Sequence, residues 1–153
     1  MRLTLIRHSE AGARIAWSGD DAERPLDEDG MRQAAELVEL LDLAPETRLL
    51  ASPYLRCVQT LEPLAASLGA GVEAEEMIGE LASTWTILEF LAQLLDSGLD
   101  TAVSSHGNVV PILLRGLAER GHVDSQPWYC EKGSAWDIHI GDPSRTRYLP
   151  PPR

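Results

Sequence analysis

The sequence predicts a single α/β domain built as a three-layer α/β/α sandwich, with a mostly parallel central sheet and helices on both faces. Short apolar runs alternate along the chain with longer segments whose apolar residues recur at helical spacing. Hydrophobic residues make up 44% and charged residues 24% of the 153 residues, which is the composition of a globular domain with one buried core. We expect this domain to cover residues 1–149 and the Pro-rich residues 150–153 to form a frayed tail.

The first third of the chain predicts two buried strands separated by a helix. Residues 3–6 (LTLI) and 48–51 (RLLA) are short and apolar, as buried parallel strands are. Between them, after residues 25–27 (PLD), apolar residues at helical spacing predict a helix that extends to Leu41.

A second helix is predicted directly after the strand at 48–51. Ser52 and Pro53 indicate its start, with Ser52 as the N-cap and Pro53 at the first helical position. The helical spacing continues until Gly69, which ends the segment. Pro63 lies inside it and predicts a kink or a local break, because proline removes a backbone hydrogen bond.

The rest of the chain continues the alternation of strands and helices. Proline in the first turn marks the start of the last helix, and a Gly-Asp-Pro turn separates the last two strands. In order, we expect a weak strand at 72–75, a helix around 88–95, a strand at 101–104, a helix from about 109 that ends near Gly121, and strands at 134–140 and 146–149.

Basic side chains gather at the carboxyl ends of three predicted strands. Arg7 and His8 follow the first strand, Arg56 lies one turn into the helix after the second, and His106 follows the strand at 101–104. In open α/β sheets, ligands bind outside the carboxyl ends of the strands. A helix starting near Asn108 also points its free N–H groups toward that edge. The sequence therefore predicts a pocket for a dianion such as a phosphate group.

Composition argues against several other classes of protein. The formal net charge is -11, which disfavours binding to nucleic acid or to an anionic membrane. Cys57 and Cys130 are too few for a disulfide framework, and the N-terminus lacks a signal-peptide pattern. The histidines show no ligand spacing, so we expect no metal and no cofactor. The simplest expectation is a soluble cytoplasmic protein.

Three segments, taken in order, resemble the motifs of a known family. Residues 7–10 (RHSE) resemble the Arg-His-Gly signature of the histidine phosphatase superfamily, also called phosphoglycerate mutase-like. Residues 52–60 (SPYLRCVQT) and 105–108 (SHGN) resemble its second and third motifs. Together they are a strong signal, and they imply the phosphoglycerate mutase-like form of the α/β sandwich.

Two branches of this family share further features with the chain. The short length and residues 24–27 (RPLD) resemble the SixA-type phosphohistidine phosphatases. Residues 19–21 (GDD), 62–65 (EPLA) and 132–134 (KGS) are also similar to the phosphatase half of two-domain hydrolases that carry a Nudix domain. The chain has no Nudix motif, so we expect a stand-alone version of that half.

The resemblance implies a covalent mechanism at the predicted pocket. His8 attacks phosphorus and forms a phosphohistidine, while Arg7, Arg56 and His106 hold the phosphate oxygens. Ser9, which stands where the family has Gly, and Asn108 are expected to line the substrate-binding site. The last catalytic candidate is Glu80, in residues 77–81 (MIGEL), which the resemblance implies as the acid that protonates the leaving oxygen. SixA-type members are thought to work without such an acid.

Other polar and aromatic residues keep two interpretations at this stage. Lys132 either faces the site or is solvated, and the tryptophans either rim a pocket or pack in the core. Glu10, Arg14, Asp20 and Asp21 are expected to be solvated loop residues rather than catalytic ones.

Three functions fit the sequence. The first is a metal-independent phosphatase that acts on a phosphorylated protein, such as a phosphohistidine protein, or on a nucleoside phosphate or other small phosphomonoester. The second is a phosphoglycerate-type mutase, although family mutases carry insertions for which this chain has no room. The third is a non-catalytic phosphate-binding regulatory domain, which would usually have lost the nucleophile or an arginine. The short loops near His8 favour the first function with an open pocket, with a phosphohistidine protein slightly preferred over a nucleoside phosphate as the substrate.

Overall fold

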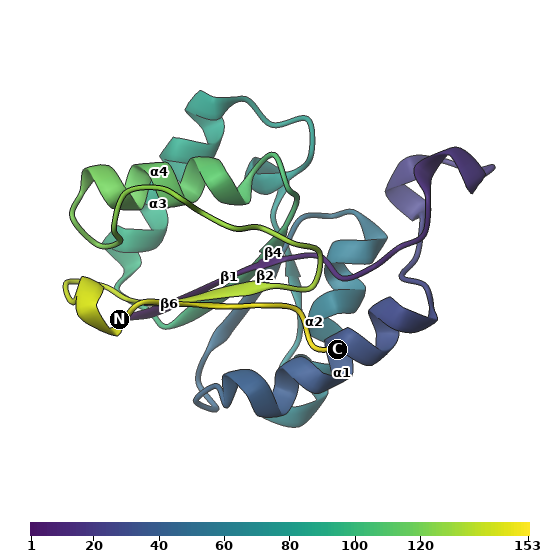
Figure 1. Cartoon of the computed structure of the whole chain (residues 1–153), viewed down its shortest axis with the longest axis horizontal. Helices are drawn as coiled ribbons and strands as arrows, with labels where there is room; N and C mark the ends of the chain where they lie inside the picture. Colours follow the sequence, from purple (N-terminus) through teal and green to yellow (C-terminus); the bar gives the residue numbers. More distant parts are fainter.

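The computed structural model describes residues 1–153 and shows a three-layer α/β/α sandwich, as predicted (Figure 1). One six-stranded sheet has the order β3-β2-β4-β1-β5-β6. Its strands are β1 (Arg2–Arg7), β2 (Arg48–Ala51), β3 (Glu73–Ala74), β4 (Thr101–Ser105), β5 (Ala135–His139) and β6 (Arg147–Leu149). The helices are α1 (Glu28–Leu41), α2 (Leu55–Leu68), α3 (Thr84–Ser97) and α4 (Val110–Glu119), with 3-10 turns η1 (Arg14–Ala16), η2 (Asp21–Glu23), η3 (Glu76–Ile78) and η4 (Pro143–Arg145).

The prediction of a mostly parallel sheet is confirmed. β1 pairs in parallel with β4, β4 with β2, and β2 with β3, while β5 and β6 add an antiparallel edge. In this register Arg7 lies opposite Ser105, and Ala51 lies opposite Ser104. The carboxyl ends of β1, β4 and β2 are therefore neighbours at one edge of the sheet, which is where the predicted site residues begin.

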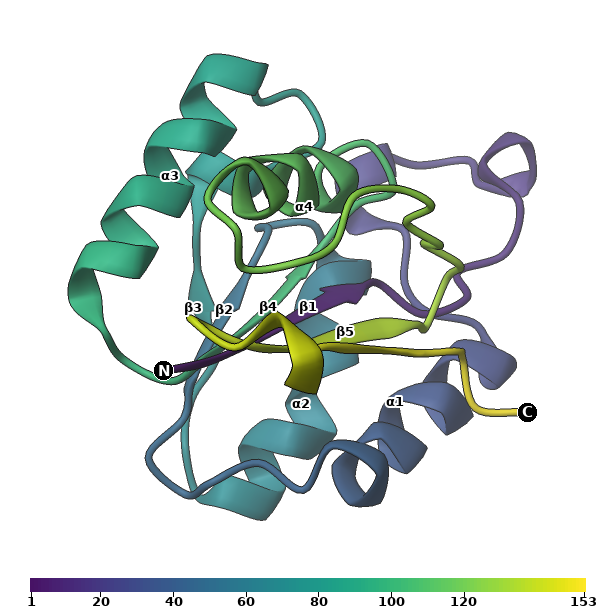
Figure 2. The same cartoon turned by 60° about the vertical axis from the view of Figure 1, so that its left-hand side comes forward.

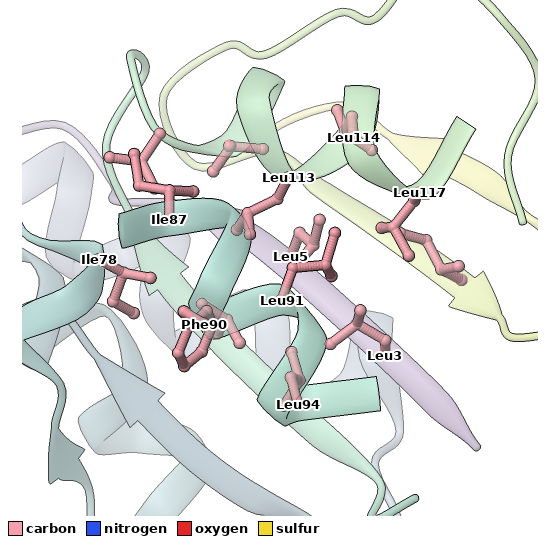
Figure 3. Close-up of a cluster of buried hydrophobic side chains, with 14 of the residues drawn as sticks. Leu3, Leu5, Ile78, Ile87, Phe90, Leu91, Leu94, Leu113, Leu114 and Leu117 are labelled. Atoms are coloured by element: carbon pink, nitrogen blue, oxygen red, sulfur yellow. The ribbon is translucent and has the colours of Figure 1, made fainter. Parts of the chain in front are cut away.

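The helices cover the two faces of the sheet in pairs, α1 with α2 and α3 with α4 (Figure 2). Successive residues of a strand point to opposite faces, so Leu3 and Leu5 of β1 pack toward α3 and α4 (Figure 3), whereas Ile6 belongs to the cluster under α1 and α2. No helix has the length and apolar content needed to cross a membrane. Two apolar layers thus hold the sheet rigid behind its carboxyl edge.

Local capping explains where the helices begin and end. The Asp27 carboxylate accepts a hydrogen bond from Gly30 N at 2.8 Å and starts α1. Ser83 caps α3 in the same way, by accepting from Thr86 N at 3.1 Å. Gly69 ends α2 in the left-handed conformation, at a φ of 64°, as its position after the periodic residues predicted.

The prediction that Ser52 caps the second helix was wrong, because α2 begins at Leu55 with Tyr54 as its N-cap. Pro63 lies inside α2, and the helix continues past it without the local break that was one of the two expected outcomes. In the Pro-rich tail, Pro151 is buried, and Pro150 and Pro152 line a groove beside Leu40 of α1.

Candidate active site

A polar cleft of about 580 Å³ opens at the carboxyl edge of the sheet. Only one of the residues that line it is hydrophobic. Of the residues named from the sequence, Arg7, His8, Glu80, His106, Asn108 and Lys132 line the cleft, whereas Ser9 and Arg56 lie behind its surface.

His8 follows β1 and is held in one protonation state. Only 5% of the residue is exposed, and its backbone N–H donates to Ser105 O at 2.9 Å. The ring Nδ1 lies 2.8 Å from Ser9 O. Because a carbonyl can only accept, Nδ1 carries the proton and Nε2 keeps its lone pair. Burial, the largest effect, lowers the pKa of His8 to about 3, so the imidazole is neutral at physiological pH.

His106 follows β4 and lies edge-on to His8, with 5.6 Å between the ring centroids. Its Nε2 is 2.8 Å from the Ser52 hydroxyl. That hydroxyl also accepts from Tyr54 N at 3.4 Å, and its own proton can be donated to Nε2 when the His106 proton resides on Nδ1. Burial is again the largest effect and lowers the pKa of His106 to about 4. His106 is therefore a neutral hydrogen-bond donor.

Arg7 lies flat beside the turn that carries the third motif. Its Nη1 donates to Cys130 O at 2.7 Å. A Cβ on Gly107 would lie 2.7 Å from Arg7 Cζ, so only glycine leaves room for the guanidinium there. Arg7 Nε is buried and has no hydrogen-bond partner.

Arg56 in α2 is fully buried beneath two carboxylates. Its Nη1 donates to Asp21 O at 2.8 Å, and its Nη2 donates to Asp21 Oδ2 at 3.0 Å and Glu80 Oε2 at 3.1 Å. Its Nε, like that of Arg7, is buried without a partner. The contacts to Asp21 and Glu80 orient the guanidinium and leave the Nε–H group as its free donor.

The segment 12–24 forms one side of the cleft and is fastened to the site by ion pairs. Arg14 donates to Glu80, and Arg24 Nε donates to Asp21 Oδ1 at 3.0 Å. Arg24 also binds the carbonyl oxygens of Ala11 and Gly12, at 2.9 and 3.1 Å. Arg14 and Asp21 are polar residues of this segment, and their ion pairs join it to Glu80 and Arg56. The signal that pointed to this segment was the resemblance of residues 19–21 and 24–27 to family sequences.

Glu80 and Asn108 meet on the other side of the cleft, where Asn108 Nδ2 donates to Glu80 O at 2.8 Å. The start of α4 differs from the prediction of free N–H groups. The N–H groups of Val109 and Val110 both donate to His106 O at 3.0 Å, because the chain turns back tightly there. These two amides hold His106 in place and are not available to a ligand.

Ser9 and Thr60 lie behind the nucleophile. Ser9 is fully buried, and its N–H donates to Thr60 Oγ1 at 3.0 Å, while the Thr60 hydroxyl donates to Arg56 O at 2.7 Å. Asp42 is the only non-glycine residue with a positive φ, so Ser9 adopts a backbone conformation open to any residue. Serine in place of the family glycine therefore brings no positive-φ strain beside His8. Thr60 was in a recognised motif but had no assigned role.

Lys132 and Cys57 complete the surroundings. Lys132 lines the cleft, with Nζ 3.9 Å from Glu10 Oε2, so the site-facing interpretation of this residue holds. Cys57 Sγ is 3.6 Å from His106 Nε2 and fully buried. Burial raises the pKa of Cys57 to about 12.

The family model of the histidine phosphatase superfamily (branch 1) matches residues 3–91. The chain belongs to this superfamily, and this membership supports a phosphatase function. An 8-oxo-(d)GTP phosphatase from Mycolicibacterium smegmatis is 33% identical over 97% of the chain, which spans 48% of that relative's length.

Solved structures of the family share the fold. The protein histidine phosphatase SixA, complexed with tungstate, has a TM-score of 0.70 at 21% identity. The match covers 99% of this chain and 96% of the SixA chain. The alpha-ribazole phosphatase from Shigella flexneri has a TM-score of 0.70 at 19% identity, over 92% of this chain and 95% of its own.

Proposed function

We propose that the protein is a metal-independent phosphatase that works through a covalent phosphohistidine on His8. The observation that carries this proposal is a pair of buried donors without partners, the Nε–H groups of Arg7 and Arg56. A buried charged donor without an acceptor is costly. Phosphate oxygens bound beside His8 would supply both acceptors, and arginine is well suited to this task.

The protonation states of the histidines support the first chemical step. His8 Nε2 attacks phosphorus with its lone pair, a new N–P bond forms, and the bond from phosphorus to the leaving oxygen breaks. The hydrogen bond from Nδ1 to Ser9 O stabilises the positive charge that the ring gains. His106 donates a hydrogen bond to a transferring oxygen, and Glu80 lies in the cleft as the candidate donor of the leaving-group proton.

Water completes the cycle by attacking phosphorus and breaking the N–P bond, which returns the lone pair to His8 Nε2. The water loses a proton to the group that protonated the leaving oxygen, Glu80 in this proposal. The products are the dephosphorylated substrate, inorganic phosphate and the unchanged enzyme. No step needs a metal ion, because the arginines supply the stabilising positive charge and His106 adds a neutral hydrogen bond.

The cleft is open, and all but one of the residues that line it are polar or glycine. Such a cleft binds the phosphate group more strongly than the rest of a small metabolite. Two substrate classes therefore fit: a phosphohistidine on the surface of a protein, and a nucleoside phosphate. The names of the similar proteins, which include a protein histidine phosphatase and an 8-oxo-(d)GTP phosphatase, support both classes.

The test is the release of phosphate from a panel of phosphorylated compounds with EDTA present. We expect wild type to be active and His8→Ala to be inactive but folded. His139→Ala is the matched control, because His139 lies on β5 opposite Arg2, at the far end of β1 from the site. Rapid quenching in alkali should keep phosphate on the enzyme and quenching in acid should release it, as a phosphoramidate requires.

Three results would contradict the proposal. Substantial activity in His8→Ala excludes the covalent step, and loss of activity in EDTA excludes the metal-independent mechanism. A wide preference for 2- or 3-phosphoglycerate over every other compound would show that the open cleft selects a small metabolite after all.

A further inference from the structure

A second hollow, of about 240 Å³, lies directly beside the phosphate cleft. The two share Gly12, Ala13 and Arg24 as lining residues, so they adjoin each other along the segment 12–24. Their chemistry differs, because five of the nine residues around the second hollow are hydrophobic. Besides the shared residues, it is lined by Ala11, Ala16, Trp17, Pro25, Leu26 and Asp27.

Trp17 supplies the aromatic ring of this hollow, and contacts with residues close to it in the chain fix the ring in position. Its Nε1 donates to Asp20 O at 2.9 Å. A Cβ on Gly19 would lie 3.1 Å from the same Nε1, so the backbone of Gly19 supports the indole closely. The residue nevertheless remains 38% exposed. The exposed ring is therefore a preorganised platform. Because it is already held in place, ligand binding costs little conformational entropy of the tryptophan side chain.

The position of Trp17 relative to the reaction is set by the ion pairs of the segment 12–24. Arg24 is a wall of both hollows, and its contact with Asp21 joins the segment to Arg56. The platform is therefore tied to the phosphate-binding arginine. In contrast, the phosphate cleft itself offers a ligand one hydrophobic residue, Ala13, and no tryptophan, tyrosine or phenylalanine.

We infer that the second hollow binds the base of a nucleoside phosphate whose terminal phosphate lies at His8. This inference rests on the proposed function and selects one of its two substrate classes. Bases stack on aromatic side chains with little dependence on sequence, and an indole has the flat apolar surface that this requires. The polar cleft takes the anion and the adjacent apolar hollow takes the ring, so the two sites match the two halves of one ligand.

The experiment compares nucleotides with substrates that lack the base. Values of kcat/KM are measured for guanosine 5'-monophosphate against ribose 5-phosphate, and for guanosine diphosphate against inorganic pyrophosphate. Wild type should prefer at least one nucleotide over its base-free partner by about tenfold or more, mainly through KM. Trp17→Ala should remove that preference, and Trp17→Phe should keep most of it.

Trp85→Ala is the matched control, because Trp85 on α3 is 80% exposed and lines neither hollow. It should leave the nucleotide preference unchanged. A wild type without preference for either nucleotide, or a Trp17→Ala variant that retains the preference, would overturn the inference. Efficient turnover of a phosphohistidine protein with no effect of Trp17→Ala would point to the other substrate class and would also overturn it.

A binding measurement separates this inference from the proposed function. Calorimetric titration of guanosine diphosphate into His8→Ala and into the double variant His8→Ala/Trp17→Ala needs no turnover. Binding about tenfold weaker in the double variant supports the base site even if no substrate is hydrolysed. Equal affinities, or no binding to either variant, would contradict the base site while leaving the phosphatase activity to be judged by the substrate panel.

Discussion

The two sides of the cleft are built in different ways. His8 and His106 form a strand-end side: both are almost completely buried, and both directly follow strands fixed in the sheet. The segment 12–24 forms a loop side, whose two 3-10 turns bury none of their residues and are joined to the site by arginine–carboxylate contacts. The difference suggests that the fold fixes the reacting groups, while the loop side can vary with the substrate.

Replacing Arg56, which lies in α2 behind the cleft, and Arg14, which lies on the loop side, gives the largest expected contrast. Arg56→Ala should lower kcat/KM by about 100-fold or more, since a preorganised donor to the transition state contributes on the order of 3 kcal/mol. Arg14→Ala should lower it by less than about fivefold, because its side chain is 62% exposed and exposed ion pairs contribute at most about 1 kcal/mol. Steady-state kinetics on one phosphomonoester measures both effects.

Arg56→Lys controls for folding, because it keeps a positive charge beside Asp21 and Glu80 while losing the planar guanidinium. It should fold and remain strongly impaired. If Arg14→Ala were as damaging as Arg56→Ala, the contrast between the two sides would fail.

The two buried histidines of the strand-end side, His8 and His106, should also make the free energy of unfolding depend on pH. The pKa values of His8 and His106, about 3 and about 4, lie below the ordinary value of 6.5, so the unfolded chain binds more protons than the folded chain between these limits. Stability should therefore be complete above pH 6.5 and fall as the pH drops below it. The slope approaches about 1.4 kcal/mol per pH unit for each histidine.

Urea unfolding at pH 7.5, 6 and 5 measures this slope. In His8→Asn the decrease between pH 6 and pH 5 should be roughly half that of wild type, because one of the two groups is gone. An unchanged slope would mean that the pKa of His8 is the same in the folded and unfolded chains, which would contradict the lowering of that pKa by burial.

Replacing Thr60 should lower kcat by less than replacing Arg56 does. The Thr60 hydroxyl connects the backbone next to His8 with the backbone of Arg56. Thr60→Val keeps the shape but loses the hydroxyl that links Ser9 N to Arg56 O. A hydrogen bond contributes about 1 kcal/mol, so kcat should fall by about fivefold with little change in KM. In Thr60→Val, nitrogen NMR of the His8 ring should show a smaller fraction of the Nδ1-protonated form than in wild type.

Thr60→Ser restores the hydroxyl and should restore both kcat and the NMR signature. Loss of stability in Thr60→Val with an unaltered His8 spectrum would show that Thr60 only stabilises the fold.

Local sequence patterns predicted the strand ends and therefore the convergence of Arg7, His8 and His106, because parallel register places those ends together. They could not predict contacts that depend on where a loop folds back. Asp21 and Arg56 are 35 positions apart, and neither periodicity nor capping relates them. The role of Ser52 was missed for a related reason: its pattern is that of a helix cap, but its hydroxyl is used by His106.

The thiol beside His106 has a consequence for the chemistry of oxidation. Electrophiles and peroxides react with thiolates, and the Cys57 thiol, with a pKa of about 12 and no exposed surface, is neither ionised nor reachable in the folded protein. A modified sulfur at this position would press directly on the ring of His106. Because α2 would have to separate from the sheet before Cys57 could react, oxidative inactivation at this cysteine is limited by how often that helix opens.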